Sequence, residues 1–296
     1  MIDYSAALAV AAIVRTGSFE KAARALAVTP SAISQRVRLL EERLGAVLIE
    51  RGTPCTATDK GVWLCRHVEL VGMLESDLFE RLPGLGDQEA GPVTLDIAVN
   101  SDSLSTWFLT AAARFTTTSR ALFNIAVDDQ DHTADWLRRG QVVAAVTSLE
   151  KPVAGCKVSP LGRLRYHAAA SPQFIARHFP AGVTAEALTQ APALTFNQKD
   201  ALQSDWARRT LGATDTGPTH WLPSSHGFVE AALLGMGWGL NPINLIADHL
   251  ATGRLVELVP GATLDVTLYW QVSRLVSGQF PDLSRAVIEA AKTALL

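Results

Sequence analysis

Cysteine is scarce in this chain, and its placement excludes several classes of protein. The 296 residues contain three cysteines, Cys55, Cys65 and Cys156. They are odd in number and far apart, and no CxxC pair or Cys/His cluster has the spacing of a metal site. We therefore expect no disulfide framework, no bound metal and no other cofactor, and thiols that stay reduced in a reducing compartment.

Long apolar runs are also missing. No run reaches the roughly 18 residues that a membrane-spanning helix needs. The N-terminal stretch is apolar, but Asp3 precedes it, and it has neither a basic start nor a small-residue cleavage site. We predict a cytoplasmic protein with no membrane partner.

The chain has no net positive charge, yet its charges are unevenly distributed. The formal net charge is −3. Residues 1–66 carry nine Lys and Arg against six Asp and Glu, whereas residues 67–90 carry one Arg against six acids. A modestly basic head on an acidic body is typical of a DNA-binding module carried by another domain.

Signatures of common enzymes are absent as well. The sequence has no GxSxG, HExxH or P-loop motif. GMGWG at 235–239 lies between a predicted helix and a predicted strand, which is the wrong order for a dinucleotide site. Ser225 precedes His226, but neighbours in sequence do not make a catalytic triad. We predict a protein that is not an enzyme. The alternative is a solute-binding or catalytic α/β domain protein without a DNA role.

The length and the 48% of hydrophobic residues predict two or three domains of an α/β protein. Residues 1–57 are dense in short helical patterns. Residues 58–91 comprise one long helix followed by GLGDQEAGP at 84–92, a Gly-rich linker or hinge. Residues 92–296 alternate strand and helix patterns.

The head contains two short helices joined by a tight turn. Ser18 can cap the first helix, whose apolar positions follow the spacing of one helix face. These positions are Phe19, Ala22, Ala23 and Leu26. Thr29 is a good N-cap for the second helix, and Pro30 occupies the first helical position, where proline is favoured.

The second helix has two opposite faces at 100° per residue. The apolar face comprises Ile33, Val37, Leu40 and Leu44. The other face comprises Ser31, Ser34, Gln35 and Arg38. Its short side chains let the backbone approach DNA, Gln can read adenine, and Arg can read guanine or bind phosphate. We predict a recognition helix that enters the major groove, with Thr29 and Arg36 as further DNA contacts. The alternative is a solvated surface face.

Residues 47–61 predict a two-stranded wing. Arg51 and Thr53 near its tip are candidates for contacts with the DNA backbone or minor groove. The alternative for Arg51 is an exposed loop charge.

These motifs resemble a known family. The segment GSFEKAARALAVTPSAISQRVRLLEERLGAVLIER looks like the winged helix-turn-helix of LysR-type transcriptional regulators, and the likeness extends along the whole chain. VNSDSLSTWF, VDDQDH, LRRGQVVAAVTS and LYWQ are similar to the ArgP/LysG branch. The resemblance implies a regulator of export or metabolism genes that senses lysine or arginine, binds promoter DNA and has RNA polymerase as a candidate partner. One departure is the wing, where CTATDKG replaces the more usual LT-x-x-G.

The long helix has an apolar side that its own small head cannot cover. Its positions are Trp63, Leu64, Val68, Leu70, Val71, Leu74 and Leu78. Pairing with a second copy would cover this side and place two recognition helices on one face of DNA. The alternative is packing against its own effector domain. The resemblance implies homodimers that pair into homotetramers.

The C-terminal part predicts a parallel α/β sheet whose ligands bind at the carboxyl ends of strands. Strands are expected at 93–99, 122–127 and 142–147, and later ones at 192–196 and 264–273. Ser101, Asp102 and Ser103 can cap a helix that runs through Trp107, and a later helix starts near Gly227. The resemblance implies two lobes with a hinge, similar to periplasmic binding proteins.

Serine and aspartate at these strand ends suit a basic amino acid. Hydroxyls and helix N-termini can bind its carboxylate, whereas carboxylates and aromatic rings suit its cationic groups and stem. The predicted effector-binding residues are Asn100, Ser101, Asp102, Ser103, Trp107, Asp128, Asp129, Thr147, Ser148, Ser224 and Ser225. Asp131 and Trp238 are weaker candidates. The alternatives are helix capping for 101–103, turn acids for 128–129 and core packing for the two tryptophans.

Overall fold

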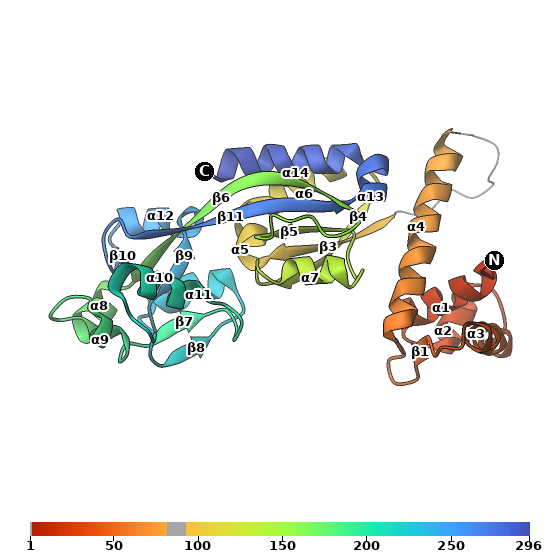
Figure 1. Ribbon diagram of the computed structural model, residues 1–296, viewed down its shortest axis with the longest axis horizontal. Coiled ribbons are helices and arrows are strands. Elements are labelled where there is room, and N and C mark those ends of the chain that lie inside the picture. The colour runs from red at the N-terminus through yellow and green to blue at the C-terminus, as the bar shows by residue number, and fades with distance from the viewer. Residues whose placement is uncertain (1, 82–92) are drawn as a thin grey trace. The chain divides into compact units, whose positions relative to one another are not determined.

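The structure is a computed structural model that describes residues 2–81 and 93–296. The chain divides into an N-terminal unit and a larger unit made of Thr94–Arg138 and Val142–Leu296. Figure 1 shows the elements of both units. The predicted 84–92 linker lies outside the described residues. Among the residues that are described, no helix is both long and apolar enough to cross a membrane.

Three helices form the core of the N-terminal unit (Figure 1). They are α1 (Tyr4–Thr16), α2 (Phe19–Ala25) and α3 (Pro30–Leu44). The predicted caps are confirmed, since the side chain of Ser18 accepts from the Lys21 N–H and that of Thr29 accepts from the Ala32 N–H. Each cap satisfies a backbone donor that its helix leaves free, so both helices begin where local chemistry places them.

The apolar face of α3 packs into this core with one exception. Ile33, Val37 and Leu40 are buried with residues of α1 and α2. The prediction for Leu44 was wrong, because this residue is 48% exposed. It is the last residue of α3, and Gly45 ends the helix in the left-handed conformation at φ +61°. The chain turns away there, so no core lies beneath Leu44.

The wing and the long helix follow α3. Strands β1 (Ile49–Glu50) and β2 (Thr56–Ala57) pair antiparallel, and α4 spans Asp59–Arg81. Thr58 Oγ1 accepts from the Gly61 N–H at 3.1 Å and so caps the start of α4. Leu64 and Val68 of α4 join the core of the unit.

The larger unit contains a seven-stranded mixed sheet. Strands β3 (Thr94–Asn100), β4 (Leu122–Asp128) and β5 (Ala144–Thr147) are parallel, as predicted. The predicted parallel pairing does not extend to the rest of the sheet, because β6 (Cys156–Ala170) and β11 (Thr263–Ser273) pair antiparallel, and β11 also pairs antiparallel with β5. The C-terminal strand returns through the middle of the sheet, which local periodicity does not reveal.

Strands β6 and β11 run through two lobes. One end of the pair lies beside β5, and the other end of β6 pairs with β9 (Gly239–Pro242) and β10 (Val256–Glu257). In the first lobe, α6 (Leu109–Thr116) and α14 (Pro281–Ala294) lie on one side of the sheet and α7 (Thr133–Arg138) on the other (Figure 1). A short helix α13 (Arg274–Gln279) precedes α14.

The second lobe is built on β9, β10 and a small parallel pair, β7 (Ala193–Thr195) and β8 (Thr219–Trp221). Its helices are α8 (Pro172–His178), α9 (Ala185–Leu188), α10 (Leu202–Leu211), α11 (Ser225–Leu233) and α12 (Ile243–Ala251). The two chain crossings that the family resemblance implied are therefore the strands β6 and β11.

Two helices begin earlier than predicted. The helix after β3 starts at Ser101, so residues 101–103 form its first turn (α5) instead of capping it. It continues through a π-helical turn at Leu104–Phe108, labelled η1, into α6. Helix α11 starts at Ser225, with Ser224 as its N-cap. Both shifts move hydroxyl-bearing residues from a cap into a first helical turn, which sets the direction of their side chains.

Candidate DNA interface and interlobe pocket

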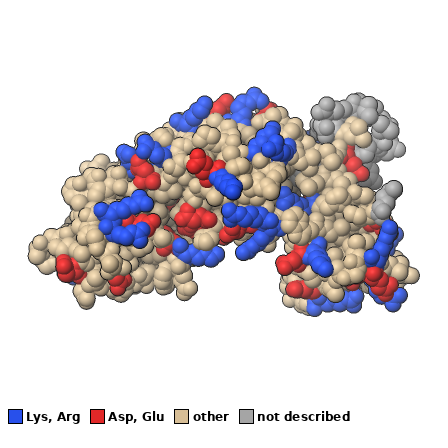
Figure 2. Space-filling view, in the orientation of Figure 1, with Lys and Arg blue, Asp and Glu red and all other residues tan. Residues whose placement is uncertain are grey.

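The polar face of α3 lies on the surface of the N-terminal unit. Ser31, Gln35 and Arg38 are exposed, whereas Ser34 and Arg36 are half-buried. Thr29 Oγ1 lies 3.0 Å from Ser31 Oγ at the start of the helix. Figure 2 shows Lys and Arg side chains along the lower edge of this unit, interspersed with acids. Short hydroxyls next to an amide and a guanidinium form a surface that can approach base edges.

Arg38 is paired only loosely. Its Nε lies 3.4 Å from Glu42 Oε1, one turn further along α3, and both side chains are more than half exposed. Such an exposed pair contributes about 0.3–0.5 kcal/mol to stability, so a phosphate or base could displace Glu42 at little cost.

The wing places its arginine beside the first helix of the motif. The Arg51 guanidinium lies 5.4 Å from the centre of the Phe19 ring, within range of a cation–π contact. Thr53 is exposed in the loop between β1 and β2. Both side chains are therefore accessible from solvent, and Arg51 has a contact that restrains its direction.

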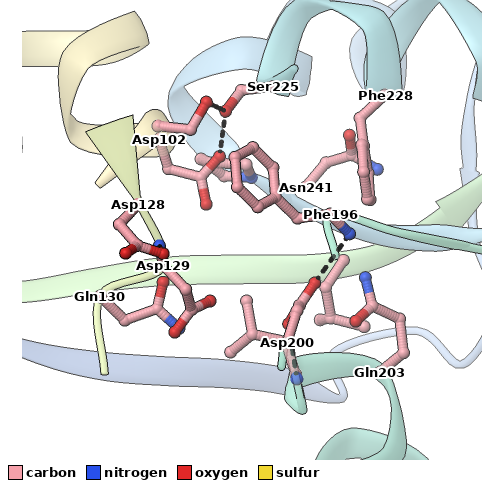
Figure 3. A pocket seen from close by; sticks show the side chains of 14 residues that line it. Asp102, Asp128, Asp129, Gln130, Phe196, Asp200, Gln203, Ser225, Phe228 and Asn241 are labelled. Atoms are coloured by element: carbon pink, nitrogen blue, oxygen red, sulfur yellow. Dashed lines mark hydrogen bonds between the residues drawn. The ribbon is translucent and has the colours of Figure 1, made fainter. Parts of the chain in front are cut away.

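A pocket lies between the two lobes of the larger unit (Figure 3). The space between its lining atoms, including the part open to solvent, is about 410 Å³. The predicted residues that line it are Ser101, Asp102, Asp128, Asp129 and Ser225. The residues that sequence reasoning missed are Gln130, Phe196, Asp200, Leu202, Gln203, Phe228, Leu240, Asn241 and Pro242. Of the described residues that form this lining, none is Lys or Arg.

Asp102 is the centre of a hydrogen-bond network on one side of the pocket. Its Oδ1 lies 2.6 Å from Ser225 Oγ on α11, and its Oδ2 accepts from Tyr166 OH on β6 at 2.7 Å. Ser225 Oγ also lies 2.9 Å from Ser101 Oγ. Burial raises the pKa of Asp102, although both hydroxyl bonds oppose that rise. The network joins the first lobe to the second.

Asp128 is the last residue of β4, Asp129 follows it, and both line the same pocket. Asp128 Oδ1 accepts from the Asp129 N–H, and its Oδ2 accepts from Trp136 Nε1 at 2.9 Å. Asp129 is only 5% exposed, and burial raises its pKa to about 6. Its Oδ1 accepts from the Asp131 N–H. A cation that enters the pocket would offset the cost of ionising this buried carboxyl.

Asp200 supplies a fourth carboxyl, from the second lobe. Its Oδ2 accepts from the Phe196 N–H at 3.0 Å and its Oδ1 from the Leu202 N–H at 2.9 Å. Burial raises the pKa of this carboxyl as well. In the sequence, Asp200 could have been noticed as an acid in the polar loop after the predicted strand at 192–196. Asn241, a polar residue in the otherwise apolar β9, was a second such signal.

Six of the predicted effector-binding residues do not line the pocket. Asn100, Ser103 and Trp107 are buried in the first lobe, with side-chain atoms that have no hydrogen-bond partner among the described residues. Thr147 and Ser148 donate to the Gln130 carbonyl, at 3.1 and 3.3 Å, and thereby hold the loop that carries Asp129. Ser224 caps α11 through the Gly227 N–H.

The two weaker candidates also lie elsewhere. Trp238 is fully buried against the Trp206 ring, 5.5 Å between ring centres. Asp131 is exposed and accepts from Ser148 Oγ. The described residues contain no group of three or more His, Cys, Asp or Glu side chains arranged to hold a metal ion.

Comparison with known proteins assigns both units to one family. A family model described as "Bacterial regulatory helix-turn-helix protein, lysR family" matches residues 6–62, and one described as "LysR substrate binding domain" matches residues 87–293. The transcriptional regulator ArgP of Pseudomonas aeruginosa is 44% identical over 274 residues, which cover 93% of this chain and 91% of that protein.

Solved structures agree with this assignment. The C-terminal domains of a LysR family protein from Agrobacterium tumefaciens are 60% identical, with a TM-score of 0.67 over 69% of this chain and 98% of theirs. Full-length LysG from Corynebacterium glutamicum, solved with bound effector Arg, is 34% identical, with a TM-score of 0.72 over 99% of both chains. With a helix-turn-helix unit, a two-lobed unit and these relatives, the chain belongs to the LysR family of DNA-binding transcriptional regulators.

Proposed function

We propose that this regulator responds to a basic amino acid, lysine or arginine, that binds between the two lobes. The observation that carries the proposal is the pocket lining, which has four carboxyl groups and, among the described lining residues, no Lys or Arg. Buried carboxyls are costly unless a cation or hydrogen-bond donors compensate them. The structure of LysG from Corynebacterium glutamicum with bound effector Arg supports this choice of ligand.

The amino-acid end of the ligand would bind beside Asp102. Asp102 can receive the α-ammonium group, and the Ser101 hydroxyl can donate to the α-carboxylate, since the O–H of Ser225 is donated to Asp102. Phe196 and Phe228 offer apolar surface for the aliphatic stem. Because the lining comes from both lobes, a bound ligand would favour one relative arrangement of the lobes over others.

The N-terminal unit would read promoter DNA with α3. We assign base contacts to Ser31, Ser34, Gln35 and Arg38, with Thr29, Arg36, Arg51 and Thr53 as backbone contacts. We assign DNA binding to residues 1–57, dimerisation and linkage to 58–91 and effector binding to 92–296. We further propose that the protein acts in the cytoplasm as a homodimer or homotetramer. It would control export or metabolism genes, with RNA polymerase as a further partner.

Calorimetry on the full-length protein tests the effector. Lysine, arginine, histidine and leucine would be titrated separately at pH 7.5. We expect saturable binding of lysine or arginine and none of leucine, because leucine lacks a cationic tail. Tighter binding of leucine than of either basic amino acid would contradict the proposal.

A gel shift tests the DNA role. The native protein would be titrated onto the region upstream of its own gene at moderate salt, where counterion release no longer masks specificity. We expect a specific complex that the basic amino acid alters in affinity or mobility. Equal affinity for that region and for unrelated DNA of the same length would contradict it.

A further inference from the structure

Two amide oxygens in the pocket lack a hydrogen-bond partner among the described residues. They are Oε1 of Gln203, on α10, and Oδ1 of Asn241, on β9. The two residues are 3% and 1% exposed, so these atoms are hidden from bulk water. An unsatisfied buried acceptor is unfavourable, because it has lost its hydrogen bonds to water. Such atoms in the wall of a pocket indicate that a ligand supplies the missing donors.

The orientation of both amides is set by bonds on their nitrogen side. Asn241 Nδ2 donates to the Gly239 carbonyl at 3.1 Å. The Gln203 side chain lowers the pKa of Asp200, which is the effect of an amide N–H that faces the carboxylate. Exchanging oxygen and nitrogen in either amide would place an oxygen against an oxygen. In both residues the oxygen is therefore the atom left without a partner.

Two of the pocket carboxyls on the first lobe already have partners for both oxygens. Asp102 accepts from Tyr166 and Ser225, and Asp128 accepts from the Asp129 N–H and from Trp136. Figure 3 places Asp102 and Ser225 on one side of the pocket and Asp200 and Gln203 on the opposite side. The unsatisfied acceptor of Gln203 therefore lies on the side of the pocket opposite Ser225, and Asn241 lies between the two sides.

We propose that Gln203 and Asn241, together with Asp200, form the subsite for the cationic tail of the effector. This assignment rests on the proposed function, a basic amino acid in the interlobe pocket. In an amino acid the α-ammonium and α-carboxylate share one carbon atom, so both must bind at the same end. The Ser101 hydroxyl beside Asp102 suits that end, and the guanidinium or ε-ammonium group then reaches the acceptors of the second lobe. Gln203 and Asn241 thus act as specificity-determining residues.

Two isosteric variants of the full-length protein test the subsite. Asn241→Leu and Gln203→Met each remove an acceptor with little change in volume. Hydrogen bonds to charged groups contribute enough that we expect each variant to weaken arginine binding about 10- to 100-fold in calorimetry. The matched control is Gln279→Met. The Gln279 amide atoms are also buried without a partner among the described residues, but this residue does not line the pocket. The control should bind arginine within about 2-fold of the native protein.

An arginine analogue distinguishes the two ends of the ligand. Argininic acid carries a hydroxyl in place of the α-ammonium and keeps the guanidinium. If the subsite holds the guanidinium, each variant weakens argininic acid by the same factor as arginine. Weaker binding of arginine with unchanged binding of argininic acid would place the α-ammonium at this subsite and overturn the assignment. Arginine affinity within about 3-fold of native in both variants would also overturn it.

A crystal structure of the native protein with arginine keeps the test independent of how the variants fold. We expect guanidinium nitrogens within about 3.2 Å of Gln203 Oε1 and Asn241 Oδ1. The α-ammonium at those atoms, or both oxygens bonded to water with arginine bound elsewhere in the pocket, would refute the subsite and leave the proposed function standing. A native protein that binds no basic amino acid would remove the proposed function and this subsite together.

Discussion

Ser225 Oγ lies 2.6 Å from Asp102 Oδ1, although the two residues are 123 positions apart and belong to different lobes. The bond joins the first turn of α5 to the first turn of α11. Because Asp102 lines the pocket and also bridges the lobes, a ligand that contacts it acts on the contact between the lobes. We therefore expect this pair to couple occupancy of the pocket to the arrangement of the two lobes.

Replacing Asp102 should separate effector sensing from DNA binding. Asp102→Asn keeps the size of the side chain but removes its charge, so we expect arginine to bind at least about 10-fold more weakly in calorimetry. DNA affinity without effector, measured by fluorescence anisotropy, should stay native. Ser103→Ala is the matched control, because Ser103 is adjacent and fully buried but does not line the pocket. An Asp102→Asn protein with native arginine affinity would refute the role of this carboxyl.

Arg38 should contribute directly to operator binding. Arg38→Ala should cost about 1–3 kcal/mol of binding free energy if the guanidinium reads a base. The loss of its exposed pair with Glu42 should change stability by less than about 0.5 kcal/mol. Arg43→Ala, on the same helix but off the Ser31/Gln35 face, is the control and should bind more tightly than Arg38→Ala. Equal affinities of the two variants for operator would contradict the assignment.

Asp129 should make both stability and effector binding depend on pH. Its pKa of about 6 is above the ordinary value of 3.8, so the native state binds more protons than the unfolded state between these values. The stability gained from protonating Asp129 is present at acidic pH and is lost as the pH rises through 6. Asp129→Asn should therefore raise the free energy of unfolding at pH 7.5 by about 1–3 kcal/mol, and by less at pH 4.5. Urea denaturation at both pH values measures this difference.

The ligand side of the same prediction has the opposite sign. Native affinity for arginine should fall as the pH drops below 6, because protonated Asp129 no longer attracts a cation. Asp248→Asn, at an exposed position of α12, is the control for both measurements. If the free energy of unfolding of Asp129→Asn at pH 7.5 is no higher than that of the control, the ionised Asp129 carboxyl does not destabilise the native state.

Helix α4 should mediate self-association through its exposed apolar residues. Trp63 is 55% exposed, and Leu74 and Leu78 are each 47% exposed. A double Leu74→Glu, Leu78→Glu variant places two charges on this face, so we expect dissociation to monomers in sedimentation equilibrium. Glu75→Gln at the neighbouring exposed position should leave the native association state. A double variant that remains fully associated at micromolar concentration would exclude this face as the contact.

Some site residues could be predicted from the sequence because their signal is local. A polar cluster at the end of a predicted strand indicated Ser101, Asp102, Asp128 and Asp129, and all four line the pocket. The same rule misplaced Ser103, because residues 101–103 lie within a helical turn and successive side chains point about 100° apart. Ser101 and Asp102 therefore line the pocket, whereas the next residue, Ser103, is buried in the core.

Other site residues gave no local signal that separates them from ordinary loop or strand residues. Asp200, Gln203 and Asn241 come from a loop, a helix and a strand of the second lobe. Their role as pocket lining depends on β6 and β11, which carry the second lobe against the first through long antiparallel pairing. That pairing is set by residues about a hundred positions apart, and periodicity within one segment does not report it.

The sequence by itself determined the helix-turn-helix of this regulator, including its capped helix starts and the polar face of α3, because each depends on neighbours within one or two turns. It also determined the order of strands and helices in the first lobe. Tertiary structure decided the mixed pairing of the sheet and the composition of the pocket. The reason is that Asp102, Asp200 and Asn241 become buried only where segments distant in the sequence meet. The neighbours from those segments determine the hydrogen-bond partners of each side chain and the pKa of each carboxyl.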